Sequence, residues 1–250
     1  MRVLVTRPEP GATKTAERLR ANGFEPVLMP LTRIADLAPD KADLSAACAG
    51  AYAVTSANAI RAWRSVGIDP DCLDLPIYAV GARTGVAATE AGFRDVRIGA
   101  GNGTDLARKI LDDIASGALA RRLQAPLLYV AGRQRHGDFE TELERENVAV
   151  RVVETYEIMQ ISYSTDFVIG LFKHDPPDVI LLYSAVAAER FFEIANTMFD
   201  LKLLNTSRFF CISRNVADAV PVEFAERTIV AAAPDEDRLM ALFDESGNLF

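Results

Sequence analysis

The sequence predicts an α/β fold with two similar domains, each built on a parallel β-sheet. Short apolar runs alternate with helical patterns along the 250 residues, as in βαβ units covered by helices on both faces. The alternating series then occurs a second time, with Ile34 matching Ile158 and Ser56 matching Ser184, at offsets of 124 and 128 (158 − 34 and 184 − 56). A duplication of four β-α units with so long a period indicates two domains rather than a solenoid of short repeats.

In the first series each apolar run precedes a segment with helical periodicity. The strand–helix pairs are expected at 2–6 and 13–23, 51–55 and 56–67, 76–81 and 83–92, and 95–99 and 104–116. Gly23 and Gly92 stand where helices end, and Ser56 and Thr104 stand where N-caps belong. The second series repeats the pattern at 126–132 and 139–147, 178–184 and 185–195, 208–213 and 214–220, and 228–233 and 234–246.

Two further stretches with strand character follow the first helix of each series. They are PVLMPLTRI at 26–34 and VAVRVVETYEIM at 148–159. If they pair, they form a two-stranded connection between the domains. Tyr156 would then face a cleft, although a tyrosine on a strand is by default an amphipathic residue with its hydroxyl at the surface.

Composition narrows the functional classes. A formal net charge of −8 and a pI near 4.9 oppose nonspecific binding to nucleic acids or anionic membranes, so we expect neither as a partner. The N-terminal sequence MRVLVTRPEPG does not have the pattern of a signal peptide, and no apolar run reaches the ~18 residues of a spanning helix. Three distant cysteines without a CxxC motif fit a reducing, cytoplasmic compartment.

Few motifs of catalytic chemistry are present. His136 and His174 lie in unrelated contexts, and the sequence has no HExxH, GxSxG or Walker motif, so we expect no metal site. The loop GAGNG at 99–103 has GxGxG spacing, which favours an ordinary turn over a nucleotide-binding GxGxxG loop.

Hydroxyl, small and basic residues gather at the carboxyl ends of the predicted strands, where α/β proteins bind ligands and helix N-termini attract anions. Each has a structural alternative, since Ser56 and Ser184 fit N-caps and threonines fit strands and caps. Arg7 and Arg133 match in position between the two repeats, which a surface role explains less simply. The candidate substrate-binding residues are Thr6, Arg7, Thr55, Ser56, Thr84, Gly132, Arg133, Ser184 and Asn215.

The order and spacing of these segments resemble the uroporphyrinogen-III synthase family. The similarity lies in VLVTRPEPGATKTAERLRANGFEPVLMPLTRI, AVTSANAIRAW, YAVGARTGVAATEAGF, PLLYVAGRQRHGDFETELERENVAVRVVETYEI and DVILLYSAVAAERFF, and so covers nearly the whole chain. The resemblance implies two α/β domains joined by a two-stranded β-ladder, in a bilobal arrangement. It places one domain at 1–34 plus 161–250, the second at 37–150, and the ladder at 26–36 and 148–160.

The same resemblance implies an activity and a catalytic residue. The reaction would be the cyclisation of hydroxymethylbilane to uroporphyrinogen III, with inversion of the last pyrrole ring, through an azafulvene and a spiro-pyrrolenine. Tyr156 matches the family's best-placed side chain and would protonate the departing hydroxyl, and Thr84 matches the threonine of a VGxxT segment. No metal or cofactor is implied. The expected partner is a polycarboxylate tetrapyrrole, bound by a monomer that could contact the preceding pathway enzyme transiently.

The second half departs from the family pattern. Where relatives read IGxTTA, this chain reads ISRNVA at 212–217, and LLY rather than FT precedes Ser184. Two alternatives therefore stay open. One is a non-catalytic bilobal sensor of tetrapyrroles or other polyanions, and the other is a nucleotide-binding α/β enzyme that acts at the GAGNG loop.

Overall fold

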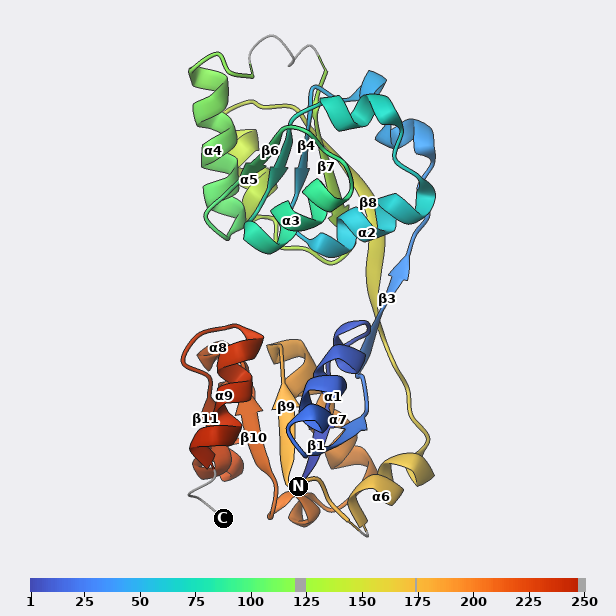
Figure 1. The fold of residues 1–250 in the computed structure, drawn as a ribbon, viewed down its shortest axis with the longest axis vertical. Coiled ribbons are helices and arrows are strands. Elements are labelled where there is room, and N and C mark those ends of the chain that lie inside the picture. The colour runs from blue at the N-terminus through green and yellow to red at the C-terminus, as the bar shows by residue number, and fades with distance from the viewer. Residues whose placement is uncertain (120–124, 174, 247–250) are drawn as a thin grey trace. The chain divides into compact units, whose positions relative to one another are not determined.

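The structure of the chain, a computed structural model, describes residues 1–119, 125–173 and 175–246 (Figure 1). It divides into two compact units. Unit 1 combines Met1–Arg33 with Met159–Phe250, and unit 2 is the continuous segment Ile34–Ile158. Each unit is built around a sheet of parallel strands, so the predicted α/β fold class is confirmed.

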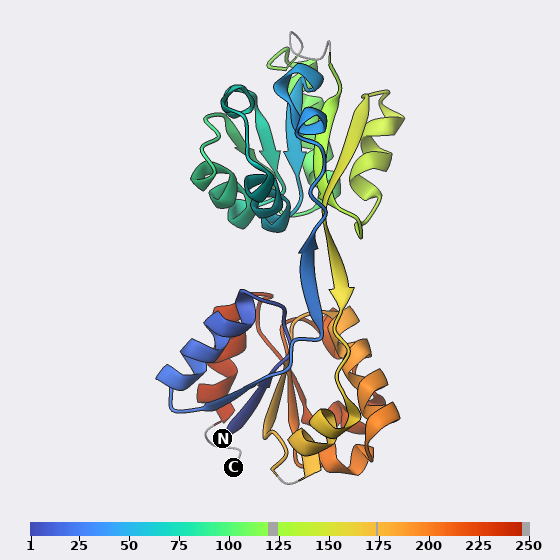
Figure 2. The same ribbon diagram turned by 90° about the vertical axis from the view of Figure 1, so that its right-hand side faces the viewer.

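In unit 1 the sheet has the order β11-β10-β9-β1-β2, and its strand pairs are parallel. The strands are β1 (Arg2–Val5), β2 (Glu25–Leu28), β9 (Val179–Leu182), β10 (Arg208–Cys211) and β11 (Thr228–Val230). Helices α1 (Gly11–Ala21) and α9 (Glu236–Ser246) pack on one face, and α6 (Thr165–Lys173), α7 (Ala185–Met198) and α8 (Arg214–Ala217) on the other (Figure 2). Successive strand residues point to opposite faces, so both faces of the sheet are apolar.

Unit 2 has a sheet of the order β3-β8-β7-β4-β5-β6. Its strands are β3 (Thr32–Asp36), β4 (Ala51–Val54), β5 (Ile77–Ala79), β6 (Val96–Ile98), β7 (Leu127–Gly132) and β8 (Val150–Gln160). Helices α2 (Ala57–Val66) and α3 (Ala82–Glu90) cover one face, and α4 (Gly103–Ala115) and α5 (Asp138–Arg145) cover the other. Short 3₁₀ helices lie at Lys41–Leu44, Ala46–Cys48 and Pro70–Asp74 in unit 2, and at Leu201–Leu204 and Val222–Arg227 in unit 1.

The two sheets place equivalent strands in the same order. Unit 1 reads β2-β1-β9-β10-β11, and unit 2 reads β8-β7-β4-β5-β6 after its edge strand β3. In the duplicated sequence β1 corresponds to β7 and β9 to β4. Each unit therefore combines the first β-α-β segment of one repeat with the other three strands of the other repeat. In unit 1 this segment is β1-α1-β2, and in unit 2 it is β7-α5-β8.

The connecting strands differ from the sequence expectation in one respect. The stretch 26–34 contains two strands instead of one. The strand β2 joins the sheet of unit 1, and the strand structure is then interrupted at Pro30, which has no backbone N–H to donate to a ladder. Of the two strands β2 and β3, it is β3 that pairs with β8. The amide of Leu37 donates to the Thr155 carbonyl at 2.9 Å and that of Ile161 to the Leu31 carbonyl at 3.0 Å, so residue numbers rise on one strand as they fall on the other. This pairing is antiparallel, as the arrows in Figure 2 show.

Helix starts follow the predicted capping residues with one exception. The Ser56 hydroxyl accepts from the Asn58 amide and that of Ser184 from the Ala187 amide, both at 3.1 Å, so both N-cap predictions are confirmed. The prediction for Thr104 is wrong. Asn102 is the N-cap of α4, because its side-chain oxygen accepts from the Asp105 amide at 2.8 Å. Within the described part of the chain, no helix combines the length and apolarity needed to cross a membrane.

Candidate functional site

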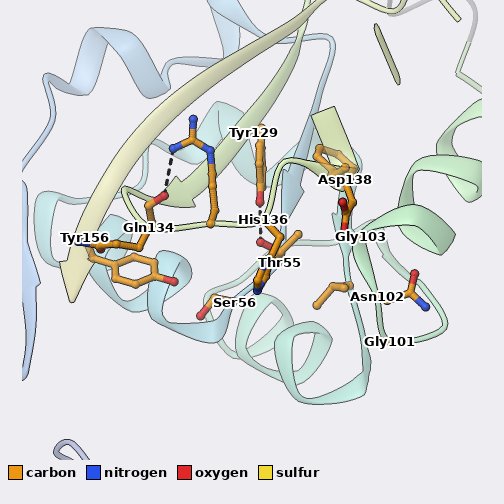
Figure 3. Close-up of a pocket in the computed structure, with 14 residues that line it drawn as sticks. Thr55, Ser56, Gly101, Asn102, Gly103, Tyr129, Gln134, His136, Asp138 and Tyr156 are labelled. Atoms are coloured by element: carbon orange, nitrogen blue, oxygen red, sulfur yellow. Dashed lines mark hydrogen bonds between the residues drawn. The ribbon is translucent and has the colours of Figure 1, made fainter. Parts of the chain in front are cut away.

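A pocket of about 400 Å³ opens at the carboxyl edge of the sheet in unit 2 (Figure 3). Thr55 and Ser56 follow β4, Val80 follows β5, and Gly132 ends β7, so the strand ends supply its floor. The loop before α4, the segment 134–136, the start of α5 and Tyr156 of β8 form the walls. This is the edge at which α/β sheets bind ligands, because helix N-termini converge there.

A β-bulge in β8 decides which way Tyr156 points. Ala131 of β7 is opposite Glu154, whereas the next residue, Gly132, is opposite Tyr156. Thr155 is therefore the extra residue, fully buried, with its hydroxyl donating to the Ala131 carbonyl at 3.2 Å. In a regular strand of the same sequence, Tyr156 would share a face with Val152, which packs toward α4 and α5. The bulge turns Tyr156 to the other face, toward α2 and α3, as bulges next to sites often re-aim a side chain.

The Tyr156 ring lies against Gly132. A Cβ atom built on Gly132 would stand only 2.6 Å from Cζ of the ring and 2.9 Å from its hydroxyl oxygen. The tyrosine is 6 % exposed, and Figure 3 shows the ring reaching from β8 toward Ser56 with its hydroxyl on the pocket side. No described residue forms a hydrogen bond with this hydroxyl. The phenol is thus held in place by packing and has its polar end available to a ligand.

Thr55 and Tyr129 form a second polar pair in the pocket. Their hydroxyl oxygens are 2.7 Å apart (Figure 3). Burial raises the pKa of Tyr129, and the hydrogen bond to Thr55 opposes that effect in part. Burial keeps the phenol neutral and Thr55 satisfies its hydroxyl, which suits a structural or hydrogen-bonding role better than proton transfer.

Ion pairs neutralise the two arginines nearest the end of β7. Arg133 contacts Glu154 at 3.1 Å and Glu157 at 2.6 Å, and Arg135 contacts Glu140 at 2.7 Å and Glu154 at 3.0 Å. Hydrogen bonds from these arginines lower the pKa of Glu154, so it stays ionised. Arg135 lines the pocket and Arg133 does not. A substrate carboxylate would have to compete with protein carboxylates for either guanidinium.

Exposed arginines also lie on the helices that Tyr156 packs against. Arg61 of α2 and Arg83 in the first turn of α3 are both exposed, and neither forms an ion pair among the described residues. Burial and then the charge of Arg83 lower the pKa of Arg61, while the Tyr156 phenol and Asp36 act in the opposite direction. Their like charges are close enough to repel, so an anion between them would be stabilised.

The predicted residues of unit 1 are largely engaged within the protein. Thr6 is fully buried and donates to the Leu181 carbonyl at 2.6 Å. Arg7 pairs with Glu236 at 2.7 Å and lies 4.4 Å from the centre of the Tyr183 ring. These contacts give both residues a structural role at the edge of the sheet in unit 1, and their part in substrate binding stays a prediction.

The remaining predicted residues are spread over both units. Ser184 caps α7, as described above, and Asn215 is exposed on the short helix α8. Val216, part of the departure from the family pattern, is buried in the apolar core beside α7, which explains an apolar residue there. Thr84 is buried on α3 and is not among the residues that line the pocket.

Sequence reasoning missed six polar residues that line the pocket: Asn102, Tyr129, Gln134, Arg135, His136 and Asp138. The last four lie between the end of β7 and the first residue of α5. Gln134 also accepts from the Ile158 amide at 2.9 Å and donates to the Ile158 carbonyl at 3.3 Å. For these four residues, the only signal in the sequence was their position directly after a predicted strand end.

The glycine-rich loop is bound to the neighbouring strand end. The Gly99 and Gly101 amides donate to the carbonyls of Ala79 and Val80, both at 2.8 Å, at the end of β5. Among residues 1–119, 125–173 and 175–246, no group of three or more His, Cys, Asp or Glu side chains could hold a metal ion. His174 lies outside the described residues.

Comparison with known proteins places this geometry in a family. Residues 13–241 match a family model described as uroporphyrinogen-III synthase HemD. A mutant uroporphyrinogen III synthase from Thermus thermophilus has a similar structure, with 18 % identity, a TM-score of 0.61 and coverage of 99 % of this chain and 98 % of that one. The uroporphyrinogen-III synthetase from Helicobacter pylori has 14 % sequence identity and a TM-score of 0.62, with coverage of 98 % of each chain. No curated protein sequence matches significantly.

Proposed function

Because the chain belongs to the uroporphyrinogen-III synthase HemD family, we propose that the pocket of unit 2 receives part of hydroxymethylbilane and that Tyr156 is its proton donor. The activity is that of a lyase of tetrapyrrole biosynthesis, and the substrate is a linear tetrapyrrole. The observation that carries the assignment of Tyr156 is its geometry. Its ring is buried and immobilised, yet its hydroxyl faces the pocket without a partner among the described residues.

The chemistry asks little of the protein besides a proton and a fixed substrate conformation. The electron-rich pyrrole expels the hydroxyl, which takes a proton from Tyr156 and leaves as water, so that an azafulvene forms. The substituted α-carbon of the last ring attacks the methylene carbon and gives a spiro-pyrrolenine. The bond between the spiro carbon and the methylene bridge to the neighbouring ring then breaks. The same methylene carbon bonds to the unsubstituted α-carbon of the last ring, which leaves that ring inverted. The proton lost from this α-carbon restores the phenol.

Carboxylate recognition is assigned to the two arginines beside Tyr156. The substrate carries carboxylates on every ring, and the protein has a net charge of −8, so local positive charge has to offset the general repulsion. Among the described residues, Arg61 and Arg83 have no carboxylate partners such as those of Arg133 and Arg135. The first turn of α3 adds unpaired backbone N–H groups, since Gly81 caps it without a side chain.

A product analysis tests the proposed function. Purified protein is given freshly prepared hydroxymethylbilane, and the two uroporphyrin isomers are separated after oxidation. We expect the inverted isomer from the wild type and mainly the uninverted isomer, formed spontaneously, from Tyr156→Phe. A Tyr156→Phe variant that gives the inverted isomer at the wild-type rate would remove Tyr156 from the mechanism.

The family assignment decides between the alternatives that the sequence left open. It favours turnover over a sensor that binds without reacting, and the amides of Gly99 and Gly101 in the GAGNG loop are already bonded to Ala79 and Val80, which offers no support for a nucleotide site. We also propose a cytoplasmic monomer without nucleic-acid partners. The three cysteines are free thiols, which supports a reducing compartment. Sedimentation of the purified protein would test the monomer, and co-elution with the preceding enzyme would test a transient contact.

A further inference from the structure

We infer that Gly132 is a positioning residue of the reaction, whose missing side chain fixes where the Tyr156 hydroxyl lies. The inference rests on the proposed function of Tyr156. It changes the expected role of Gly132 from contact with the substrate to control of the proton donor.

The backbone at position 132 does not itself require glycine. Glycines at positions such as 23, 67 and 92 have φ values of 79°, 99° and 102°, which side chains rarely adopt. Gly132 is not in this left-handed region and continues the regular strand β7. An alanine would therefore be acceptable at this position if nothing occupied the space beside it.

The Tyr156 ring occupies that space. The three atoms nearest to a Cβ on Gly132 are all at the reactive end of the tyrosine: Cζ at 2.6 Å, Cε2 at 2.9 Å and the hydroxyl oxygen at 2.9 Å. Real Cβ atoms are not found this close to other heavy atoms, so an alanine would push the phenol away. The displacement would fall on the hydroxyl and not on the main chain.

The main chain around Tyr156 is fixed independently of the ring. Its carbonyl accepts from the Arg133 amide at 2.9 Å, the bulge residue Thr155 bonds to Ala131, and Gln134 forms two hydrogen bonds with Ile158. Because the strand is held on both sides of residue 156, the ring would respond to an alanine by rotating about its side-chain bonds. A shift of ~1 Å at a proton donor can cost ~10²-fold in rate, whereas rotation of a hydroxyl that no described residue bonds costs the fold little.

A double-mutant cycle tests the inference. We expect Gly132→Ala to lower kcat by ~10- to 100-fold with KM changed by less than about threefold. In the Tyr156→Phe background the same substitution should change kcat by less than about twofold, because the hydroxyl it displaces is already absent. The Phe ring keeps the crowded Cζ and Cε2 atoms, so the fall in Tm should be equal in both backgrounds.

Gly85→Ala is the matched control. A Cβ at Gly85 would meet Cδ1 of Ile98 at 2.8 Å, but that side chain is 49 % exposed and can move aside, so kcat should stay near the wild-type value. Equal losses of kcat from Gly132→Ala in the wild-type and Tyr156→Phe backgrounds would overturn the inference, as would a wild-type kcat for Gly132→Ala. If Tyr156→Phe itself keeps full activity, the proposed function fails first, and the two failures are therefore distinguishable.

Discussion

The carboxyl edges of the two sheets are equivalent in topology, but they differ in the residues that stand there: in unit 2 they line a pocket, and around Arg7 in unit 1 they contact one another. Arg7 follows β1 in unit 1, whereas Gly132 ends β7, the corresponding strand of unit 2. The residue before the capping serine is Tyr183 in unit 1 and Thr55 in unit 2.

The first residues of corresponding helices also differ in size, with the larger residue in unit 1. The last helix of unit 1 begins with Glu236, which pairs with Arg7, whereas the corresponding helix of unit 2 begins with Gly103. Large side chains that contact one another close one edge, and small ones at matching places leave the other open. In this duplicated fold the two sheets share their strand order, and the pocket at the edge of unit 2 depends on the size of a few residues at the strand ends and helix starts.

The largest expected effect compares the tyrosines at the two edges. Tyr156→Phe should lower kcat by ~10²-fold, because it removes a positioned general acid, with a Tm shift of a few degrees at most. Tyr183→Phe should leave kcat within about twofold, because the Tyr183 hydroxyl contacts Thr15 at 3.3 Å within the packed edge. Steady-state kinetics and thermal melting measure both. Similar kinetic losses from the two substitutions would remove the functional distinction between the edges.

A second test fills the open edge. Thr55→Tyr places in unit 2 the side chain that unit 1 has at the matching position, and it should raise KM by ~10-fold because the ring enters the pocket. The lost bond to Tyr129 and the crowding should lower stability by ~1–3 kcal/mol. Thr55→Ser, which keeps the hydroxyl and adds no volume, is the control. An unchanged KM for Thr55→Tyr would show that the substrate does not enter this part of the cavity.

A third test concerns Arg61 and Arg83 of unit 2, which pair with no described carboxylate. Arg61→Gln and Arg83→Gln should each raise KM by about three- to tenfold with kcat nearly unchanged, since a lost charge-assisted hydrogen bond weakens ground-state and transition-state binding alike. Arg18→Gln removes an exposed arginine that is paired with Asp237 on unit 1, and it should leave KM unchanged. The rise in KM should shrink at high ionic strength, and a salt-independent effect would point to packing instead.

The smallest effect belongs to the ion pairs beside the pocket. The pKa of Glu154 is lowered by Arg133 and Arg135, so its pairing stabilises the protein above the ordinary carboxyl pKa of ~4.3 and is lost as pH falls through the lowered value. Glu154→Gln should therefore lower Tm by about 1–2 °C at pH 7 and by less as the pH drops below 4. Melting curves across this range test it, and a Tm difference that grows in acid would contradict the sign.

Much of the fold could be predicted because periodicity and capping are local signals. The alternating strands and helices, the duplication and the N-caps Ser56 and Ser184 follow from short patterns in the sequence. The bulge at Thr155 could not be predicted, since a single inserted residue leaves the β-branched, strand-like composition of β8 unchanged. The choice of Asn102 over Thr104 as a cap also depends on where the preceding loop closes.

The candidate site was predictable only in part. Tyr156 was identified from the family resemblance, whereas its contact with Gly132 depends on the pairing of β7 with β8. The lack of described carboxylate partners for Arg61 and Arg83 could not be inferred either, because ion pairing depends on which carboxylates the fold brings close. Arg7 and Arg133 looked alike in the sequence, and only the structure shows that each is already paired within its own unit.

The exchange of segments between the repeats sets an order of events during synthesis. On the ribosome the residues of unit 2 emerge as one continuous stretch, whereas β1 pairs with β9, which is made only after unit 2 is finished. Until then β1 lacks the neighbouring strand β9, and Val3 and Val5, which are fully buried in the folded protein, cannot be covered completely. The nascent chain therefore carries an unfinished N-terminal strand for most of its translation, a period in which chaperone binding to this segment would protect it from aggregation.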